Sequence, residues 1–231
     1  MKKALIWLFL AATLLLCFSS CATESYDLLY STEQNGITFC ARGSGTRLRQ
    51  IVIKKGDAII WSKQVHVDEA VGNLNGTYGF AVTDLNFDGH PDFTVAESVD
   101  GECATYRCWL YNTVRDSYIE SEELSGLCNV QADEELQAVF SFSHTYEAEA
   151  YGEASAAYSE CDRATKYVWE NGELIPEMYV SITYYSEAKR YCYEVASYDR
   201  TLGKFIESGD KWLTPEEYEK TDMSFLYYYR D

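Results

Sequence analysis

The sequence predicts a mainly β protein built from antiparallel sheets. Residues 177–184 and 190–196 alternate between apolar or aromatic and polar side chains, as expected of strands with two different faces. At residues 171–172, Asn-Gly separates two further strand-like stretches, and it suits a two-residue type I′ turn because both turn positions need positive φ. Lys55-Gly56-Asp57 separates another pair in the same way. We therefore expect antiparallel sheets, arranged as a sandwich or as an incomplete propeller.

The segments that favour a helix are short. Residues 133–136 and 214–220 are the helix-like windows. In the second, Thr214 suits the N-cap, Pro215 suits the first helical position, and Glu217 completes a capping box. We expect a short helix near the C-terminus.

One segment of the chain resembles another. Residues 111–121 align without gaps on residues 198–208, and each begins at a tyrosine, continues with Asn or Asp, and returns at an aromatic residue. The similarity is compatible with a duplicated sheet unit or with the same hairpin formed twice. We favour the second interpretation.

The N-terminus has the pattern of an export signal. Lys2 and Lys3 precede an uncharged apolar run over residues 4–18, and Ser19-Ser20 precede Cys21. Small residues before a cysteine resemble the lipobox of bacterial lipoproteins, in which that cysteine is acylated. Simple cleavage, with Cys21 free or disulfide-bonded, stays open. We predict a signal peptide over 1–20, a lipidated Cys21, a polar tether over 21–36 and a single β-rich domain over 37–231, held extracytoplasmically at a bacterial envelope.

Charge and cysteine content narrow the classes of function. The chain carries 37 acidic against 19 basic residues, a net charge of −18 that becomes more negative without Lys2 and Lys3. Such a surface disfavours nucleic acid and attracts cations or basic proteins. Six cysteines in an oxidising compartment predict up to three disulfides, and the absence of a CxxC pair disfavours zinc. These six are Cys40, Cys103, Cys108, Cys128, Cys161 and Cys192.

One motif carries recognisable chemistry. Residues 84–92 read D-x-N-x-D-G-x-x-D. Calcium takes six to eight oxygen ligands, and alternate side chains of a tight loop can converge on it. The first three candidate ligands are Asp84, Asn86 and Asp88. The backbone carbonyl of His90 and the carboxylate of Asp92 would follow, directly or through water. An acidic turn without metal is the alternative.

The loop departs from an EF-hand. Val95 occupies the twelfth position, where an EF-hand has a bidentate glutamate, and strand-like residues flank the loop on both sides. Glu97 or a carboxylate from elsewhere in the chain would have to complete the ligand shell.

The strand, loop and strand resemble the calcium loops of FG-GAP and VCBS repeat proteins. Together with residues 101–120, they resemble envelope lipoproteins that share a fold with periplasmic inhibitors of invertebrate-type lysozyme and include immunity proteins against peptidoglycan-cutting effectors. The similarity covers residues 78–125 well and the rest only as β-rich pattern. It implies a calcium site at the five positions above and a protein partner, but no inhibitory motif can be carried over.

The sequence gives little support for a catalytic function. Ser186 and Lys189 form an S-x-x-K string without its usual partner motifs, and no nucleophile elbow or nucleotide-binding loop is present. Fourteen of the twenty tyrosines follow residue 145, and tyrosine suits protein interfaces. We therefore expect a calcium-stabilised lipoprotein that binds a protein, such as a basic secreted hydrolase, and is not an enzyme. A carbohydrate- or cell-wall-binding module and, less favoured, a hydrolase are the alternatives.

Overall fold

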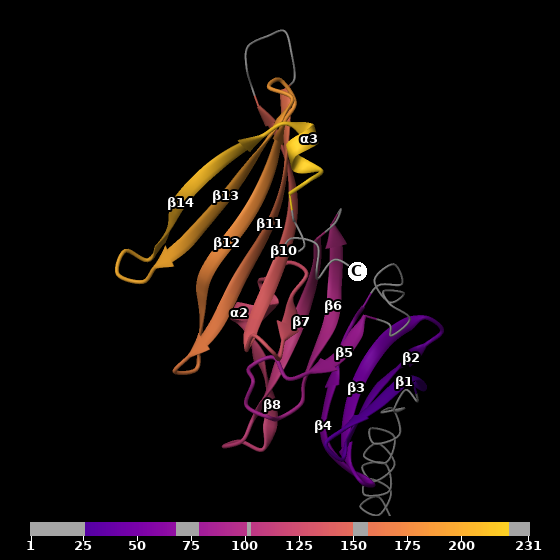
Figure 1. Ribbon diagram of the computed structural model, residues 1–231. Coiled ribbons are helices and arrows are strands. Elements are labelled where there is room, and N and C mark those ends of the chain that lie inside the picture. The colour runs from indigo at the N-terminus through magenta and orange to yellow at the C-terminus, as the bar shows by residue number, and fades with distance from the viewer. Residues whose placement is uncertain (1–25, 68–78, 101–102, 150–156, 222–231) are drawn as a thin grey trace, which may run out of the picture.

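The chain folds into three antiparallel sheets, each made of strands that follow one another in sequence (Figure 1). This is a computed structural model, and it describes residues 26–67, 79–100, 103–149 and 157–221. The prediction of a mainly β, antiparallel fold with a short helix near the C-terminus is confirmed. The signal peptide and Cys21 lie outside the described residues. Within the described part of the chain, neither helix is long and apolar enough to span a bilayer.

The sheets are named A, B and C in chain order. Sheet A contains β1 (Asp27–Gln34), β2 (Ile37–Ser44), β3 (Arg47–Lys55) and β4 (Ala58–Gln64). Sheet B contains β5 (Phe80–Thr83), β6 (Asp92–Asp100), β7 (Cys103–Asn112) and β8 (Ser117–Ser121). Sheet C contains β9 (Gln131–Asp133), β10 (Ala138–Glu149), β11 (Ala157–Glu170), β12 (Glu173–Tyr185), β13 (Arg190–Asp199) and β14 (Lys204–Leu213). In each sheet the strands pair with their sequence neighbours.

Asn-Gly turns close two of the hairpins. Asn171 and Gly172 have φ of 53° and 83° between β11 and β12, which confirms the predicted turn. Asn35 and Gly36 have φ of 53° and 74° and join β1 to β2 in the same way. The predicted tether over 21–36 is therefore wrong for residues 27–36, because this turn lets Asp27–Gln34 pair as an edge strand of sheet A.

The helices are partly as predicted. In α3 (Pro215–Tyr218), Thr214 is the N-cap and Glu217 completes the capping box. The helical window at 133–136 is wrong. These residues end β9 and turn into β10, with the Asp133 carboxylate accepting a hydrogen bond from the Leu136 amide. A four-residue helix that we did not predict, α2 (Glu122–Ser125), follows β8 and buries Leu124.

Sheets A and B share an aromatic core. The Phe93 ring lies on Trp109 of β7, with centroids 4.9 Å apart and nearly parallel planes. Trp61 of sheet A meets Phe93 edge-on at 5.3 Å, and Phe39 meets Tyr118 at 6.0 Å. Such pairs add about 0.5–1.5 kcal/mol each beyond the burial of apolar area. The two sheets are therefore held as one unit by large rings.

A charged cluster reinforces this interface. The Glu120 carboxylate accepts two hydrogen bonds from the Arg107 guanidinium, at 2.7 and 2.6 Å, and one from Lys63 at 3.0 Å. Both cations also lie over the Trp109 ring, 5.1 and 5.3 Å from its centroid. Because Lys63 belongs to β4, the cluster joins sheet A to sheet B.

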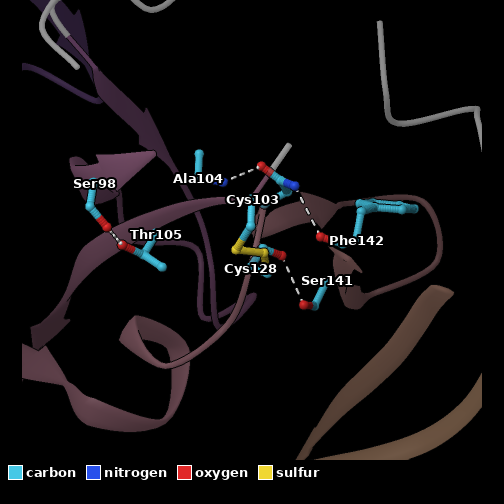
Figure 2. The surroundings of a disulfide bond; sticks show 8 residues. Ser98, Cys103, Ala104, Thr105, Cys128, Ser141 and Phe142 are labelled. Atoms are coloured by element: carbon cyan, nitrogen blue, oxygen red, sulfur yellow. Dashed lines mark hydrogen bonds between the residues drawn. A yellow bond between two sulfur atoms is a disulfide. The ribbon is translucent and has the colours of Figure 1, made fainter. Parts of the chain in front are cut away.

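A short segment after α2 ties sheet B to sheet C, as Figure 2 shows around its disulfide. Cys103 of β7 is bonded to Cys128. The Cys128 carbonyl accepts hydrogen bonds from the Ser141 hydroxyl at 2.8 Å and the Phe142 amide at 3.0 Å. Asn129 bonds both the amide and the carbonyl of Ala104, and its side-chain amide donates to the Phe142 carbonyl at 3.0 Å. The link therefore combines one covalent bond with a run of hydrogen bonds.

The sequence allowed up to three disulfides, and one forms among the described residues. Cys40 and Cys108 are buried and free, whereas Cys161 and Cys192 are half-buried and free. The last two lie opposite Thr183 on either side of β12. Two strand spacings, about 9–10 Å, exceed the roughly 7 Å that a disulfide can bridge between Cα atoms.

Candidate functional site

The predicted calcium loop is the connection between β5 and β6. Thr83 pairs with Asp92 at its base, so residues 84–91 form a closed loop at the end of a hairpin. The strands predicted on either side of it are confirmed. Phe87 and Gly89 have φ of 59° and 83°, and the glycine takes this left-handed conformation without the cost that a side chain brings.

The first three predicted ligands lie together. The Asp84 carboxylate accepts hydrogen bonds from the backbone amides of Asp88 at 3.2 Å and Gly89 at 2.8 Å. The Asn86 side-chain oxygen accepts from the same Asp88 amide at 3.3 Å. Oxygens from positions 1 and 3 therefore converge on one N–H group, and the Asp88 side chain closes the turn by accepting from the His90 amide at 2.9 Å.

Asp92 lies deeper than the other predicted ligands. Its side chain is fully buried, and its two oxygens accept hydrogen bonds from the backbone amides of Leu85 at 2.9 Å and Tyr111 at 2.7 Å. Burial raises the pKa of this carboxyl to about 7 against the lowering effect of these two hydrogen bonds, and the nearby carboxylates of Asp88 and Asp84 raise it further. The loop thus gathers three acidic groups whose negative charges oppose one another.

The donor set suits a hard cation, although its geometry is not that of a finished cage. Among the described residues, no three His, Cys, Asp or Glu side chains group closely enough to hold a metal. One converging ligand is an asparagine, and Asp92 is engaged with backbone amides. Each Asp92 oxygen still has a second lone pair, so ligation is compatible with these hydrogen bonds. The residues therefore fit calcium.

The structure also shows where the His90 ring and the Glu97 side chain lie. The His90 ring packs against Tyr111, with centroids 4.9 Å apart, which fits a role limited to its backbone carbonyl. Glu97 lies five residues along β6 from Asp92, away from the other candidate ligands. It is exposed at a β-bulge in β6, where its charge acts on Arg107.

All three sheets contact this loop. The Asn35 side chain of sheet A donates a hydrogen bond to the Gly89 carbonyl at 3.4 Å. The Trp169 indole of sheet C donates to the Leu85 carbonyl at 2.8 Å, across 84 residues of sequence. Tyr111 of sheet B donates its amide to Asp92. No local pattern in the sequence indicates the contacts from Asn35 and Trp169, because they depend on how the sheets pack.

A polar depression of about 410 Å³ opens beside the loop. Its walls come from the loop, the β1–β2 turn and the β9–β10 turn. The lining residues are Gln34, Asn35, Asp84, Phe87, Gly89, His90, Glu134 and Gln137. Sequence reasoning did not indicate Glu134 or Gln137, which come from the turn mispredicted as helix.

No family model matches this chain, and no curated protein matches it in sequence. One solved structure similar in fold is described as "Structure of a Xanthomonas Type IV Secretion System related protein". It is 14% identical, the match covers 80% of this chain and 97% of that chain, and the TM-score is 0.51. At this identity the likeness concerns the fold alone.

Proposed function

We propose that this chain is an extracytoplasmic, lipid-anchored binding protein whose fold is stabilised by calcium at the loop 84–92, and that it captures and inhibits a basic peptidoglycan hydrolase. The observation that carries the proposal is the position of the loop. Its acidic side chains lie where sheets A, B and C meet, so a cation bound there would stabilise the contacts among all three. The calcium ligands would be Asp84, Asn86, Asp88 and Asp92, with the backbone carbonyl of His90.

The chemistry that calcium supplies here is electrostatic, because a divalent charge offsets three mutually repelling carboxylates. The chain's own residues then keep their present roles. Asp92 holds the amides of Leu85 and Tyr111, and Asp84 holds the turn at Asp88 and Gly89. The metal is thus proposed to be structural, with the partner bound elsewhere on the surface.

Three observations support a protein partner. The net charge of −18 favours encounter with a basic protein and makes that encounter sensitive to salt. On sheet C, the Trp212 side chain is 45% exposed, and those of Tyr185, Tyr198 and Phe205 are half-buried. The resemblance of residues 78–125 to inhibitor-like lipoproteins favours a wall hydrolase within this class.

A turbidity assay on suspended cell walls tests the function. The domain from Tyr26 onwards should inhibit invertebrate-type lysozyme in the presence of calcium, and inhibition should weaken as salt rises. Asp84→Ala should reduce inhibition under the same conditions in which removal of calcium by a chelator reduces it. The control is Asp57→Ala in the exposed β3–β4 turn, which removes an equal charge and should have no effect. Failure to inhibit this enzyme or any other basic wall hydrolase would contradict the proposal.

Lipid anchoring is a separate part of the proposal. It rests on the sequence Ser19-Ser20-Cys21 at the end of the apolar run. Mass spectrometry of the protein extracted from membranes should show an acylated Cys21 at the N-terminus. An N-terminus at another residue would exclude the anchor but not export.

The depression beside the loop favours a second candidate function, binding of a cell-wall saccharide. Side-chain amides of Asn35 and Gln137, the Glu134 carboxylate and the Phe87 ring are groups that sugars contact through hydroxyls and apolar ring faces. Retention on purified peptidoglycan that is lost in Gln137→Ala, without inhibition of any hydrolase, would favour this alternative.

A further inference from the structure

The part of sheet C that extends beyond sheet B has one covered and one open face. Side chains alternate along β12, so Val180 and Ile182 face one side and are 5% and 3% exposed. They belong to a buried cluster that α3 contacts through Tyr218, stacked on Tyr191 at 4.0 Å. The opposite face carries aromatic and charged residues. On β12, Tyr179 and Ser181 of that face are also buried, so the face is open mainly towards the outer strand β14, whose residues are mostly exposed.

Aromatic rings are distributed across this open face. Phe205 of β14 contacts Tyr179 of β12 at 4.9 Å and Tyr198 of β13 at 5.2 Å between ring centroids. Nearer the other end of the strands, Tyr185 and Trp212 lie 5.1 Å apart. Rings of this kind bring a large rigid contact area, and tyrosine and tryptophan are enriched among the residues that dominate binding energy at interfaces.

Carboxylates accompany the rings. The strand register places Glu194, Glu207 and Asp210 on the same face, around Cys192. Burial raises the pKa of the Cys192 thiol, and the charges of Asp210, Glu194 and Glu207 raise it further. Carboxylates beside exposed rings are suited to lysine or arginine, which they attract by charge while a ring face contacts the cation.

The face already holds one such contact. The Arg163 guanidinium lies 4.4 Å from the centroid of the Tyr179 ring. Arg190 also belongs to this face, at the end of β13 beside the turn. Trp212 pairs with Cys192, whose two neighbours on this face of β13 are Arg190 and Glu194, and Asp210 lies beside Trp212 on β14. The two carboxylates therefore outnumber the one guanidinium beside the Trp212 ring, which leaves an excess of negative charge for a basic side chain to approach.

We propose that the open face of sheet C, centred on Tyr185, Trp212 and Asp210, is the surface on which a basic protein docks. This inference rests on the proposed function and specifies its binding surface. The aromatic side chains provide the apolar centre, and the carboxylates select a lysine- or arginine-bearing partner. The surface is distinct from the calcium loop, so calcium affects binding only through the stability of the fold.

Binding of invertebrate-type lysozyme to the domain from Tyr26 onwards, measured by calorimetry with calcium present, tests this surface. Trp212→Ala should raise Kd about tenfold or more, as for a central aromatic contact. Asp210→Lys should raise Kd to a similar extent and flatten its dependence on salt. The matched controls are Ile59→Ala and Asp57→Lys on sheet A, exposed positions where we expect less than about a twofold change.

The outcomes separate the two proposals. If the wild type binds and the sheet C variants bind as tightly as the sheet A controls, the docking surface is wrong and the proposed function stands. If the wild type binds neither this lysozyme nor any other basic wall hydrolase, the proposed function is wrong and the docking surface falls with it. Thermal unfolding of each variant shows whether the fold is kept, which we expect because the substituted side chains are at the surface.

Discussion

The β7–β8 and β13–β14 hairpins share a sequence pattern and a turn. In each, the residue before the turn packs against the aromatic residue after it: Tyr111 on Tyr118 at 5.3 Å, and Tyr198 on Phe205 at 5.2 Å. Asn112 and Asp199 open the turns by accepting hydrogen bonds from backbone amides three residues ahead. The equivalent positions 116 and 203 both have positive φ. The two segments therefore form the same type of hairpin, which both interpretations of the sequence similarity allow.

Their surroundings differ completely. Tyr118 is 5% exposed inside the aromatic core, and Glu120 is held by Arg107 and Lys63. The equivalent Phe205 is only half-buried, and Glu207 is exposed on the open face of sheet C. The same local pattern thus contributes to stability in the β7–β8 hairpin, which a second sheet covers. In the β13–β14 hairpin, which no second sheet covers, it is available for binding.

The largest expected effect is a difference in stability between variants of the equivalent aromatic residues Tyr118 and Phe205. Tyr118→Ala should lower the free energy of unfolding by about 3–5 kcal/mol, because a cavity forms among Phe39, Trp61 and Phe93. Phe205→Ala should cost about 1 kcal/mol, since its ring packs mainly on Tyr179 and Tyr198. Urea unfolding curves of the two variants measure the difference. Equal losses would show that the second hairpin is as much a part of the core as the first.

Calcium should also distinguish the hairpins. The loop reaches the first hairpin through the Tyr111 amide and through the contact between His90 and Tyr111. Among the described residues, it makes no hydrogen bond, ion pair or ring contact with β13 or β14. A hundredfold excess of calcium over Kd stabilises the native state by about 2.7 kcal/mol. Hydrogen exchange should slow about a hundredfold at the Leu85 and Tyr111 amides and stay nearly unchanged over 198–208.

Two controls accompany that experiment. Asp84→Ala and Asp88→Ala should each remove the protection, and magnesium should substitute poorly because it prefers a smaller octahedral shell. Equal slowing in both hairpins would mean that calcium acts on global unfolding alone. No slowing at any amide would mean that residues 84–92 are only an acidic turn.

The smallest expected effect concerns the two equivalent glutamates. The hydrogen bond from Arg107 holds the pKa of Glu120 below its ordinary value of 4.5, with a smaller contribution from Lys63. A lowered pKa in the folded state stabilises the protein above the ordinary value, and that stability is lost as pH falls below it. Glu120→Gln should therefore cost about 1 kcal/mol at neutral pH, less at acidic pH, because the carboxylate is partly exposed.

Glu207→Gln is the matched change in the second hairpin. It should lower the free energy of unfolding less than Glu120→Gln does at neutral pH, because the Glu207 side chain is exposed, and it should weaken partner binding. Unfolding curves collected from pH 3 to pH 7 compare the two variants. A pH profile for Glu120→Gln that follows the wild type throughout would contradict the role of the Arg107–Glu120 pair.

Local chemistry explains which features could be predicted from sequence. The Asn171-Gly172 turn, the Thr214 cap and the loop at 84–92 each depend on neighbouring residues, so their patterns are informative by themselves. Strand β1 shows where this kind of prediction fails. Asn35-Gly36 carries the same turn signal as Asn171-Gly172, but it lies in a polar stretch that we interpreted as a tether. At 133–136, a run of acidic residues favoured a helix in isolation, but pairing of β9 with β10 made it a turn.

The sequence by itself determined the mainly β class, the positions of several turns, and the loop that we propose as a calcium site. Only the tertiary structure decided that Asp92 is buried, that Trp169 and Asn35 reach the loop, and that Cys103 bonds Cys128 while Cys161 and Cys192 stay apart. The physical reason is distance along the chain. Turns and caps form between residues a few positions apart, whereas burial and long-range hydrogen bonds depend on which sheet faces pack together, and alternation along a strand does not specify which sheet will cover it.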